Sequence, residues 1–445
     1  MTRVIEVIVA VLMVAVLGLV VALLLPDEGS TSRSIEVSHD LRHVYDILNN
    51  YRRFPDYGVL RAYDPNTTFD FSGPAYGPGA TISWQSSNPK VLDGSLDIVS
   101  AEPAASDVST QGSATIVWKL KHQGGFLNGW YGHDQRIVID LERTGRAQKL
   151  VRITMRYKVK YGWNLIDRLS QLYIHGEPAA FIQYTLNNLQ NTLASIPNIS
   201  YDGVKPQLVD TPRQPILFVS TTAKRTLDDV DAATSKAMTA IDAAMKKLGV
   251  TAAGQRTTFT TDYGDENYRF AVAVPISSTT LTVAGQSDDL TQPGTPAAAS
   301  SSADQGGTTT AAEAPGTWLA KGALEVEGPV EARMAFGGRA LMATWNGSPA
   351  GVPLTRLQLK AYALTHGYAF DDGVHRFYDV LTSDPATTAY DQQTFNVYLP
   401  VSNAPAQTPE QAAVAAPAAA SSAPAPATST PASVGSAPAA TASAG

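Results

Sequence analysis

Residues 151–161 read VRITMRYKVKY, and this stretch decides the fold class of the first half of the chain. Its apolar side chains, from Val151 to Tyr161, alternate strictly with arginine, threonine and lysine. A period of two sustained over this length predicts an antiparallel β-strand with one buried and one solvated face. Two shorter segments, 80–85 and 116–121, alternate in the same way. The inward positions of the three predicted strands include three large aromatic residues, Trp84, Trp118 and Tyr157.

Helices are predicted on both sides of these strands. A short strand at 34–37 precedes a helix over about 40–51, for which Ser38 is the expected N-cap. The closing helix is expected to begin near Pro178, because proline suits the first helical turn. It carries an apolar stripe made of Ile182, Leu186, Leu189, Leu193 and Ile196. The order of strand, helix, antiparallel meander and long helix predicts an α+β domain over residues 33–198.

Four stretches of this first domain resemble the START-like superfamily, also called SRPBCC or polyketide cyclase/dehydrase proteins. They read SIEVSHDLRHVYDILNNYRRFPDY (34–57), GPGATISWQSS (77–87), GSLDIVSAEP (94–103) and RLSQLYIHGEPAAFIQYTLNNLQNTLASI (168–196). The resemblance implies a helix-grip fold, in which a curved sheet wraps a long helix and leaves an apolar cavity between them. Members bind lipids, sterols or polyketides, and some are enzymes. Trp84, Trp118 and Tyr157 would then line the cavity, or they would fill it as core residues.

An internal repeat organises residues 205–403. The first copy reads PILFVSTTAKRTLDDVDAATSKAMTAIDAAMKKLGV (215–250) and ends with NYRFAVAVPIS (267–277). The second reads RALMATWNGSPAGVPLTRLQLKAYALTHGY (339–368) and ends with TFNVYLPVS (394–402). Each copy predicts strand, helix, glycine stop and two strands, and Gly249 is expected to cap the first helix. This pattern resembles the GyrI-like effector-binding domain, which implies a duplicated α+β domain with a pseudo-twofold groove for small molecules.

Aromatic residues are the candidate ligand contacts in this second domain. They are Tyr268, Phe270, Tyr378, Phe395 and Tyr398, although strand alternation alone would place some of them in a core. The resemblance also implies a buried carboxylate for cationic ligands, but the corresponding positions hold Asn396 and Ala271. These two departures weaken both a cationic-drug function and a hydrolase function.

Residues 4–25 predict a membrane anchor. The run from Val7 to Leu25 has no charged residue, and as a helix it would span about 30 Å, the thickness of the hydrocarbon layer. It ends in Leu25 and Pro26 without the small residues of a cleavage site, so we expect it to stay uncleaved. Arg3 precedes the run. The positive-inside rule then predicts a single-pass inner (cell) membrane protein with a cytoplasmic N-terminus and extracytoplasmic, periplasmic domains.

Composition predicts two disordered segments and excludes several functions. Residues 285–316, inserted in the second domain, and the tail 404–445 are rich in Ala, Gly, Pro, Ser and Thr and almost free of large apolar side chains. The 445 residues include no cysteine, which excludes disulfides, zinc–thiolate sites and thiol nucleophiles. The net charge of −7 argues against nucleic-acid binding. No motif for a cofactor is found, so none is expected.

Histidines offer a weak metal hypothesis. His39 and His43 lie four residues apart, as do His375 and Asp379, but neither pair has a third ligand in a predictable place, so solvated faces are expected. The sequence therefore predicts a membrane-anchored protein that binds small apolar or amphipathic molecules in two tandem domains without catalysis. The alternatives are a cyclase- or hydrolase-type enzyme, or an envelope scaffold protein. The sequence names no protein partner.

Overall fold

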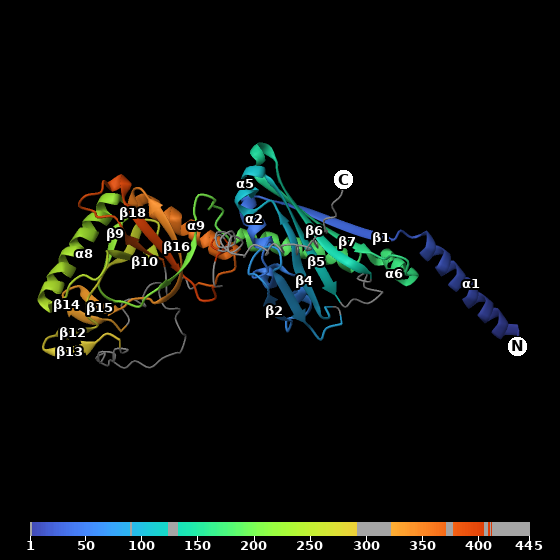
Figure 1. The fold of residues 1–445 in the computed structure, drawn as a ribbon, viewed down its shortest axis with the longest axis horizontal. Coiled ribbons are helices and arrows are strands. Elements are labelled where there is room, and N and C mark those ends of the chain that lie inside the picture. Colours follow the sequence, from blue (N-terminus) through green and yellow to red (C-terminus); the bar gives the residue numbers. More distant parts are fainter. Residues whose placement is uncertain are drawn as a thin grey trace, which may run out of the picture.

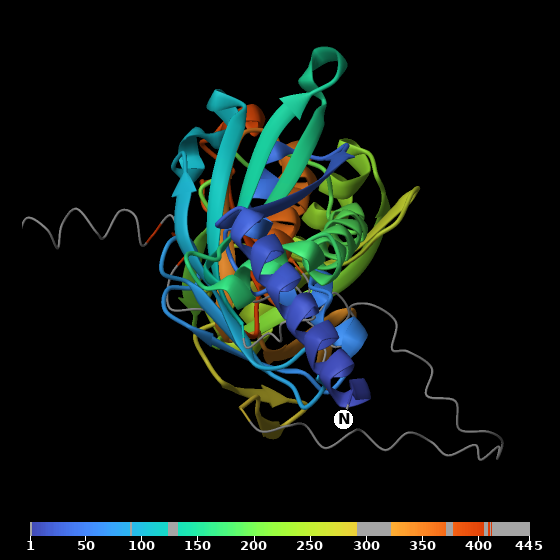
Figure 2. The same ribbon diagram turned by 90° about the vertical axis from the view of Figure 1, so that its right-hand side faces the viewer.

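The computed structural model describes residues 2–89, 91–122, 132–291, 322–370, 377–404, 408–409 and 411. An apolar helix, α1 (Thr2–Leu24), is followed by two α+β domains arranged end to end (Figure 1). Helix α1 is long and apolar enough to cross a membrane, and nearly all of its side chains are exposed. It projects from the first domain, as the view along the long axis shows (Figure 2).

The first domain is an antiparallel sheet that packs against a long helix. Its seven strands run in the order β1-β7-β6-β5-β4-β3-β2. Their bounds are β1 (Glu28–Val37), β2 (Thr68–Ser72), β3 (Thr81–Gln85), β4 (Gly94–Glu102), β5 (Ser113–His122), β6 (His133–Thr144) and β7 (Leu150–Lys160). The alternation predicted for 151–161 is confirmed, because Val151, Ile153, Met155, Tyr157, Val159 and Tyr161 are all buried.

Helices close one side of this sheet. Helix α7 (Glu177–Ala194) packs against β1, β7 and α3 (Phe54–Tyr57), and its predicted apolar stripe is buried. Helix α2 (Leu41–Leu48) is buried along its whole length between the sheet and the second domain. The other helices are the short α4 (Leu60–Tyr63), α5 (Val108–Gln111) and α6 (Leu165–Leu169). Helix α6 contacts α1, so α1 rests on the first domain.

Two boundaries in this domain differ from the sequence prediction. The N-cap of α2 is Asp40, whose side chain accepts a hydrogen bond from the backbone N–H of Arg42, and not Ser38. Strand β1 begins at Glu28 instead of residue 34, because β7 continues to Lys160 and offers a pairing partner over the whole length. As a result β1 starts four residues after α1 ends, with hydrogen bonds from the Tyr161 and Gly162 amides to the Asp27 carbonyl.

The second domain contains a nine-stranded antiparallel sheet whose order displays the internal repeat. The order is β14-β15-β9-β11-β10-β17-β18-β16-β8. The bounds are β8 (Gln207–Thr211), β9 (Pro215–Lys224), β10 (Thr257–Tyr263), β11 (Asn267–Pro275), β14 (Leu324–Glu327), β15 (Val330–Met334), β16 (Gly338–Asn346), β17 (Tyr378–Leu381) and β18 (Thr394–Pro400). The first copy lies as β9-β11-β10 and the second as β17-β18-β16, so the two copies mirror each other about the β10–β17 pair.

Each copy contributes one long helix to the same face of the sheet. Helix α8 (Leu227–Leu248) packs on β9 and β11, and α9 (Val352–Thr365) packs on β16 and β18. Gly249 follows α8 with φ of 68°, which confirms the predicted left-handed cap. Strand register places Val272, Thr258, Asp379 and Val397 side by side in one row on this helix face.

The first residues of both predicted disordered segments are ordered. Gln286–Asp289, the strand β13, pairs with β12 (Thr280–Val283) in a hairpin whose turn holds Ala284 and Gly285 at positive φ. The apolar Leu281 of β12 is buried, which gives this hairpin a packed side. At the start of the tail, the Gln411 side chain bonds to the backbone of Leu208 in β8. Residues 292–316 of the predicted insert and most of the tail lie outside the described residues.

Candidate functional site

A groove lies between the first halves of α8 and α9 and has a volume of about 430 Å³. Its floor comes from the central strands of the sheet, and its walls come from the first turns of the two helices. Its lining includes three of the predicted aromatic residues together with a set of charged residues. These residues are Tyr268, Phe270, Phe395, Arg225, Asp231, Arg256, Arg356 and Asp379.

The aromatic part of the groove is a layered cluster. The rings of Tyr268 and Phe270 stack with centroids 4.5 Å apart, and Tyr263 meets Tyr268 edge-on at 5.2 Å. The Tyr268 hydroxyl lies 3.0 Å from the Thr260 hydroxyl. Burial raises the pKa of the Tyr268 phenol, so the group is protonated at neutral pH. The cluster offers an apolar surface with one neutral hydroxyl.

A buried ion pair crosses the groove floor. The Arg356 guanidinium of α9 donates through Nη2 to the Asp379 carboxylate of β17 and, at 3.3 Å, to the Tyr268 hydroxyl. Both charged side chains are nearly inaccessible, at 10% and 7% exposure. Burial opposes the charge on Arg356, but the Tyr268 oxygen and the Asp379 carboxylate outweigh burial and raise the pKa of the guanidinium. Arg356 is therefore charged, and it already engages the Asp379 carboxylate.

A second arginine in the groove has no such partner. Arg256 immediately precedes β10, two positions before Thr258. Its Nε is buried and has no hydrogen-bond partner among the described residues. Burial lowers the pKa of Arg256, against the opposing influence of Asp379 and Asp231. The Nε of Arg356 is likewise a buried donor without a partner in the described part of the chain. The groove thus holds two unused guanidinium donors.

The structure divides the five aromatic residues predicted for this groove between two faces of the sheet. Tyr268, Phe270 and Phe395 line the groove. Tyr378 and Tyr398 lie on the opposite face, where their rings stack with centroids 4.7 Å apart. The five residues therefore do not share one face of the sheet, because the side chains of Tyr378 and Asp379, neighbours in β17, point to opposite faces. Asn396, the position expected to replace a family carboxylate, bonds to Thr344 on the neighbouring strand.

The three aromatic residues predicted for the first domain lie together in its core. Trp84, Trp118 and Tyr157 are at most 2% exposed. Trp118 donates its indole N–H to the Leu48 carbonyl at 3.2 Å and packs against the rings of Tyr51 and Phe54. A separate hollow of about 440 Å³ at the ends of β4, β5 and β6 is lined by polar residues such as Asp93, Lys121 and His133. Ligand contact by the three aromatic residues stays a prediction.

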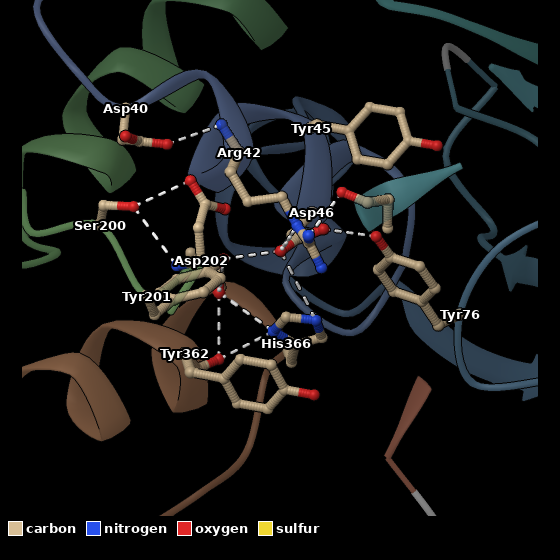
Figure 3. A network of polar contacts seen from close by, with 12 residues as sticks. Asp40, Arg42, Tyr45, Asp46, Tyr76, Ser200, Tyr201, Asp202, Tyr362 and His366 are labelled. Carbon is tan, nitrogen blue, oxygen red and sulfur yellow. Dashed lines mark hydrogen bonds and ion pairs between the residues drawn. The ribbon is translucent and has the colours of Figure 1, made fainter. Parts of the chain in front are cut away.

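A buried polar cluster joins the two domains (Figure 3). Asp46 of α2 accepts hydrogen bonds from Arg42 at 2.7 Å, from Tyr201 at 2.7 Å and from Tyr76. His366, which follows α9, lies 3.8 Å from the Asp46 carboxylate, and its ring stacks on Tyr362. Since Arg42, Asp46 and Tyr76 belong to the first domain and His366 to the second, we call this group the interdomain cluster.

The predicted solvent exposure of two histidines is wrong. His39 and His43 are 8% and 0% exposed, and their Nδ1 atoms lie 3.2 Å apart. His43 also stacks on Tyr201 of the segment between the domains, at 4.6 Å. Burial lowers the pKa of His43 to about 4, so this imidazole is neutral at pH 7. The prediction failed because the surface that covers them comes from the distant residues 196–201.

Sequence reasoning missed the charged residues of the groove. Asp379 was expected on a solvated face, but it is 5% exposed. His375, its proposed neighbour, lies outside the described residues. The available signal was one acidic residue inside the short apolar strand Tyr378–Leu381. An isolated acidic residue in such a strand is rarely buried unless it is paired with a cation.

No protein-family model matches the chain, and no curated protein matches it. Among solved structures it is similar to the C-terminal domain of EcmrR, at 10% identity over 45% of this chain and 99% of that one, with a TM-score of 0.31. It is similar to a hydrolase from Listeria innocua at 16% identity, covering 44% and 92%, with a TM-score of 0.27. A Thalictrum norcoclaurine synthase matches at 12% identity, covering 37% and 96%, with a TM-score of 0.25. No family assignment follows from similarities of this size.

Proposed function

We propose that this protein is a membrane-anchored, non-catalytic binding protein for small apolar or amphipathic molecules. The groove of the second domain is its principal binding site. The observation that carries this proposal is the combination of a 430 Å³ groove, an aromatic surface and buried polar groups at one place. Ligand sites are commonly concave and mostly apolar, with a few fixed polar groups that orient the ligand.

The proposal includes the family arrangement that the sequence resembles. A GyrI-like second domain is supported by the mirrored strand order about β10 and β17. A START-like first domain, with a second ligand site at Trp84, Trp118 and Tyr157, is supported by a sheet of seven strands packed on α7. The packing of Trp118 against Tyr51 and Phe54 favours instead a structural role for this domain, as in an envelope scaffold.

Membrane attachment is supported by the surroundings of α1, and the extracytoplasmic side of the proposal rests on Arg3 before the apolar run. Arg168 of α6 donates to the Leu25 carbonyl at 3.3 Å and lies over the ring of Trp163. Trp163 is 87% exposed, and Leu172 and Tyr173 are also exposed in the next turns. Tryptophan and tyrosine gather where a protein meets lipid headgroups, so this segment fits the membrane edge of a single-pass protein.

An enzyme acting in the groove is the weaker alternative. General acid–base catalysis needs a group that can exchange a proton near neutral pH. Asp379 is held by Arg356, and burial raises the pKa of Tyr268 away from neutrality. Both features favour a site that binds without transforming its ligand.

A pair of substitutions on one strand tests the binding function. Phe395 and Tyr398 both lie on β18, but Phe395 lines the groove and Tyr398 faces the opposite side. With the full-length protein in a non-ionic detergent, we expect Phe395→Leu to weaken binding of 2-naphthamide at least fivefold and Tyr398→Leu to change it less than twofold. Isothermal titration calorimetry measures both, with thermal unfolding as the check on folding. Equal effects of the two substitutions would contradict the groove as the site.

The anchor has its own test. We expect the full-length protein to remain in the membrane fraction after an alkaline carbonate wash, with its domains open to protease only from the extracytoplasmic side. Recovery of a shortened, soluble protein would show that the N-terminal segment is cleaved.

A further inference from the structure

The charges of the residues that line the groove do not cancel, because cationic side chains outnumber acidic ones. Three are arginines, Arg225, Arg256 and Arg356, and two are acidic, Asp231 and Asp379. The Arg356–Asp379 pair is neutral as a unit. Arg225 is used by the fold, because it donates to the Gly264 and Asp265 carbonyls and lies 4.1 Å above the Tyr263 ring. Asp231 is exposed at the rim of α8, so Arg256 is the charge left for a ligand deep in the groove.

The donors of Arg256 are placed for an acceptor that the described chain does not supply. Its Nε is buried and has no hydrogen-bond partner among the described residues, and the same holds for the Nε of Arg356. A buried donor without a partner destabilises the fold, and the loss is larger when the donor is charged. A buried polar group without a partner calls for an explanation, and here the groove beside it gives a bound molecule room to supply the acceptor. A carboxylate or sulfonate has the acceptor geometry that a guanidinium binds best.

The nearby helix start has the same electrostatic preference. Pro349, Ala350, Val352 and Pro353 line the groove, so the first turn of α9 opens onto it. This turn has no acidic residue and no side-chain cap. The Val352 N–H bonds to the Pro349 carbonyl and Pro353 has no N–H, so it is the helix dipole that favours a negative charge in front of this turn. The start of α8 differs, because Asp228 and Asp229 already occupy its first turn.

We infer that the groove selects a small monoanionic amphiphile, whose acidic group pairs with Arg256 and whose apolar body lies on Tyr268, Phe270 and Phe395. This inference rests on the proposed binding function and adds the charge of the ligand to it. The ligand class is thus opposite in charge to the cations that the family resemblance implies. The buried carboxylate such cations would need is neutralised here by Arg356.

Three probes that share one ring system test the sign of the ligand charge. They are 2-naphthoate, 2-naphthamide and protonated 2-naphthylmethylamine, titrated into the full-length protein in a non-ionic detergent at pH 7.5, with detergent-only titrations subtracted. We expect naphthoate to bind at least tenfold more tightly than naphthamide, and the cation to bind most weakly. The preference for the anion should shrink as salt is raised, because the charge pair is partly screened.

Variants then assign the preference to one side chain. Arg256→Met should bring the naphthoate-to-naphthamide affinity ratio to within about twofold of one, and Arg256→Lys should restore part of it. Asp231→Asn, an exposed change, should raise naphthoate affinity two- to threefold. The matched control is Arg269→Met, because Arg269 is an exposed arginine on the neighbouring strand β11, between Tyr268 and Phe270.

Each failure has a separate meaning. Equal binding of naphthoate and naphthamide by the unsubstituted protein would overturn the inference about charge and leave the binding function standing. An anion preference that survives Arg256→Met would overturn the role of Arg256. If none of the three probes binds up to its solubility, the proposed binding function fails and the inference fails with it.

Discussion

Arg356 connects the packing of the second domain to the chemistry of its groove. Replacing Arg356 with Met leaves the Asp379 carboxylate buried without a cation, and breaking a buried pair in this way costs about 3–5 kcal/mol. We expect Arg356→Met to lower the free energy of unfolding by that amount in urea titrations. The double variant Arg356→Met/Asp379→Leu should recover part of the loss, since no unpaired charge remains. A double variant less stable than the single one would show that the pair itself stabilises the fold.

Trp118 is the residue at which the ligand site predicted for the first domain can be tested. Its ring fills the core, and its indole N–H satisfies the Leu48 carbonyl. We expect Trp118→Leu to destabilise the protein by about 3 kcal/mol, from lost packing and from an unpaired carbonyl. Binding of an apolar fluorophore to the folded variant is measured in parallel. A large loss of binding with little loss of stability would assign Trp118 to a ligand cavity.

The sequence predicted the burial of some single residues correctly and that of others incorrectly. Trp84, Trp118 and Tyr157 were placed inward by local alternation, and all three are buried. Asp379 was misplaced, because both Tyr378 and Asp379 are buried in a strand covered on its two faces, so alternation carries no information there. Arg256 could not be recognised as a groove residue, since its neighbours in space come from α8 and β17.

At the scale of elements, the end of α8 depends on one glycine. Gly249 has φ of 68°, and a Cβ built there would meet no atom within 4 Å. The effect of Gly249→Ala is therefore conformational, and we expect a loss of about 1 kcal/mol in the free energy of unfolding. Gly249→Asn should cost less, because asparagine tolerates the left-handed region. Gly203→Ala is the control: that site is also open but has no positive φ, and a loss of similar size there would refute the explanation.

Elements were predicted well where the pattern is local and long. Strand β7 and helix α7 follow their apolar periods closely. Composition failed at Gln286–Asp289, where polar residues form a strand because β12 lies beside them. The N-cap of α2 was misplaced by two residues, since serine and aspartate are equally good caps and the sequence offers both.

At the scale of the whole molecule, the interdomain cluster couples the stabilities of the two domains. Asp46→Asn removes the charge that Arg42 and His366 face, which leaves a buried arginine without its ion pair. We expect the full-length protein to show one calorimetric transition in which both domains unfold together, and Asp46→Asn to split it into two. Tyr76→Phe removes one hydrogen bond and should keep a single transition, with about 1 kcal/mol lost. Two separate transitions before any substitution would contradict the coupling.

His43, which stacks on Tyr201 beside the interdomain cluster, makes the stability of the fold depend on pH. Burial, with a contribution from His39, lowers the pKa of His43 to about 4, although Asp40 and Asp46 oppose this. Between pH 6.5 and 4 the unfolded chain therefore binds a proton that the folded chain does not, so stability falls as the pH falls through this window. The limiting slope is about 1.4 kcal/mol per pH unit for each such histidine. Urea titrations from pH 7.5 to 4 should show a shallower decline for His43→Gln; an unchanged slope would contradict this source.

No sequence pattern could have predicted the interdomain cluster. Its hydrogen bonds join residues 155 and 164 positions apart, from Asp46 to Tyr201 and from Tyr201 to Thr365. Such contacts depend on how two finished domains meet, and periodicity reports only neighbours within one element. The apolar N-terminal helix and the order of the main strands and helices were predicted from the sequence, but the contact between the two domains was not.

The direct passage from α1 into β1 sets the orientation of α1 relative to the first domain. A flexible tether would let the domains sweep through a hemisphere, but here the Leu25 and Asp27 carbonyls are bonded to Arg168, Tyr161 and Gly162. These hydrogen bonds restrict the rotation of α1 relative to the first domain. The second domain lies at the end of the molecule opposite α1 (Figure 1). Under the proposed membrane attachment, the groove would lie at the end of the molecule away from the lipid. A ligand of the proposed kind would then enter the groove from water and not from within the membrane.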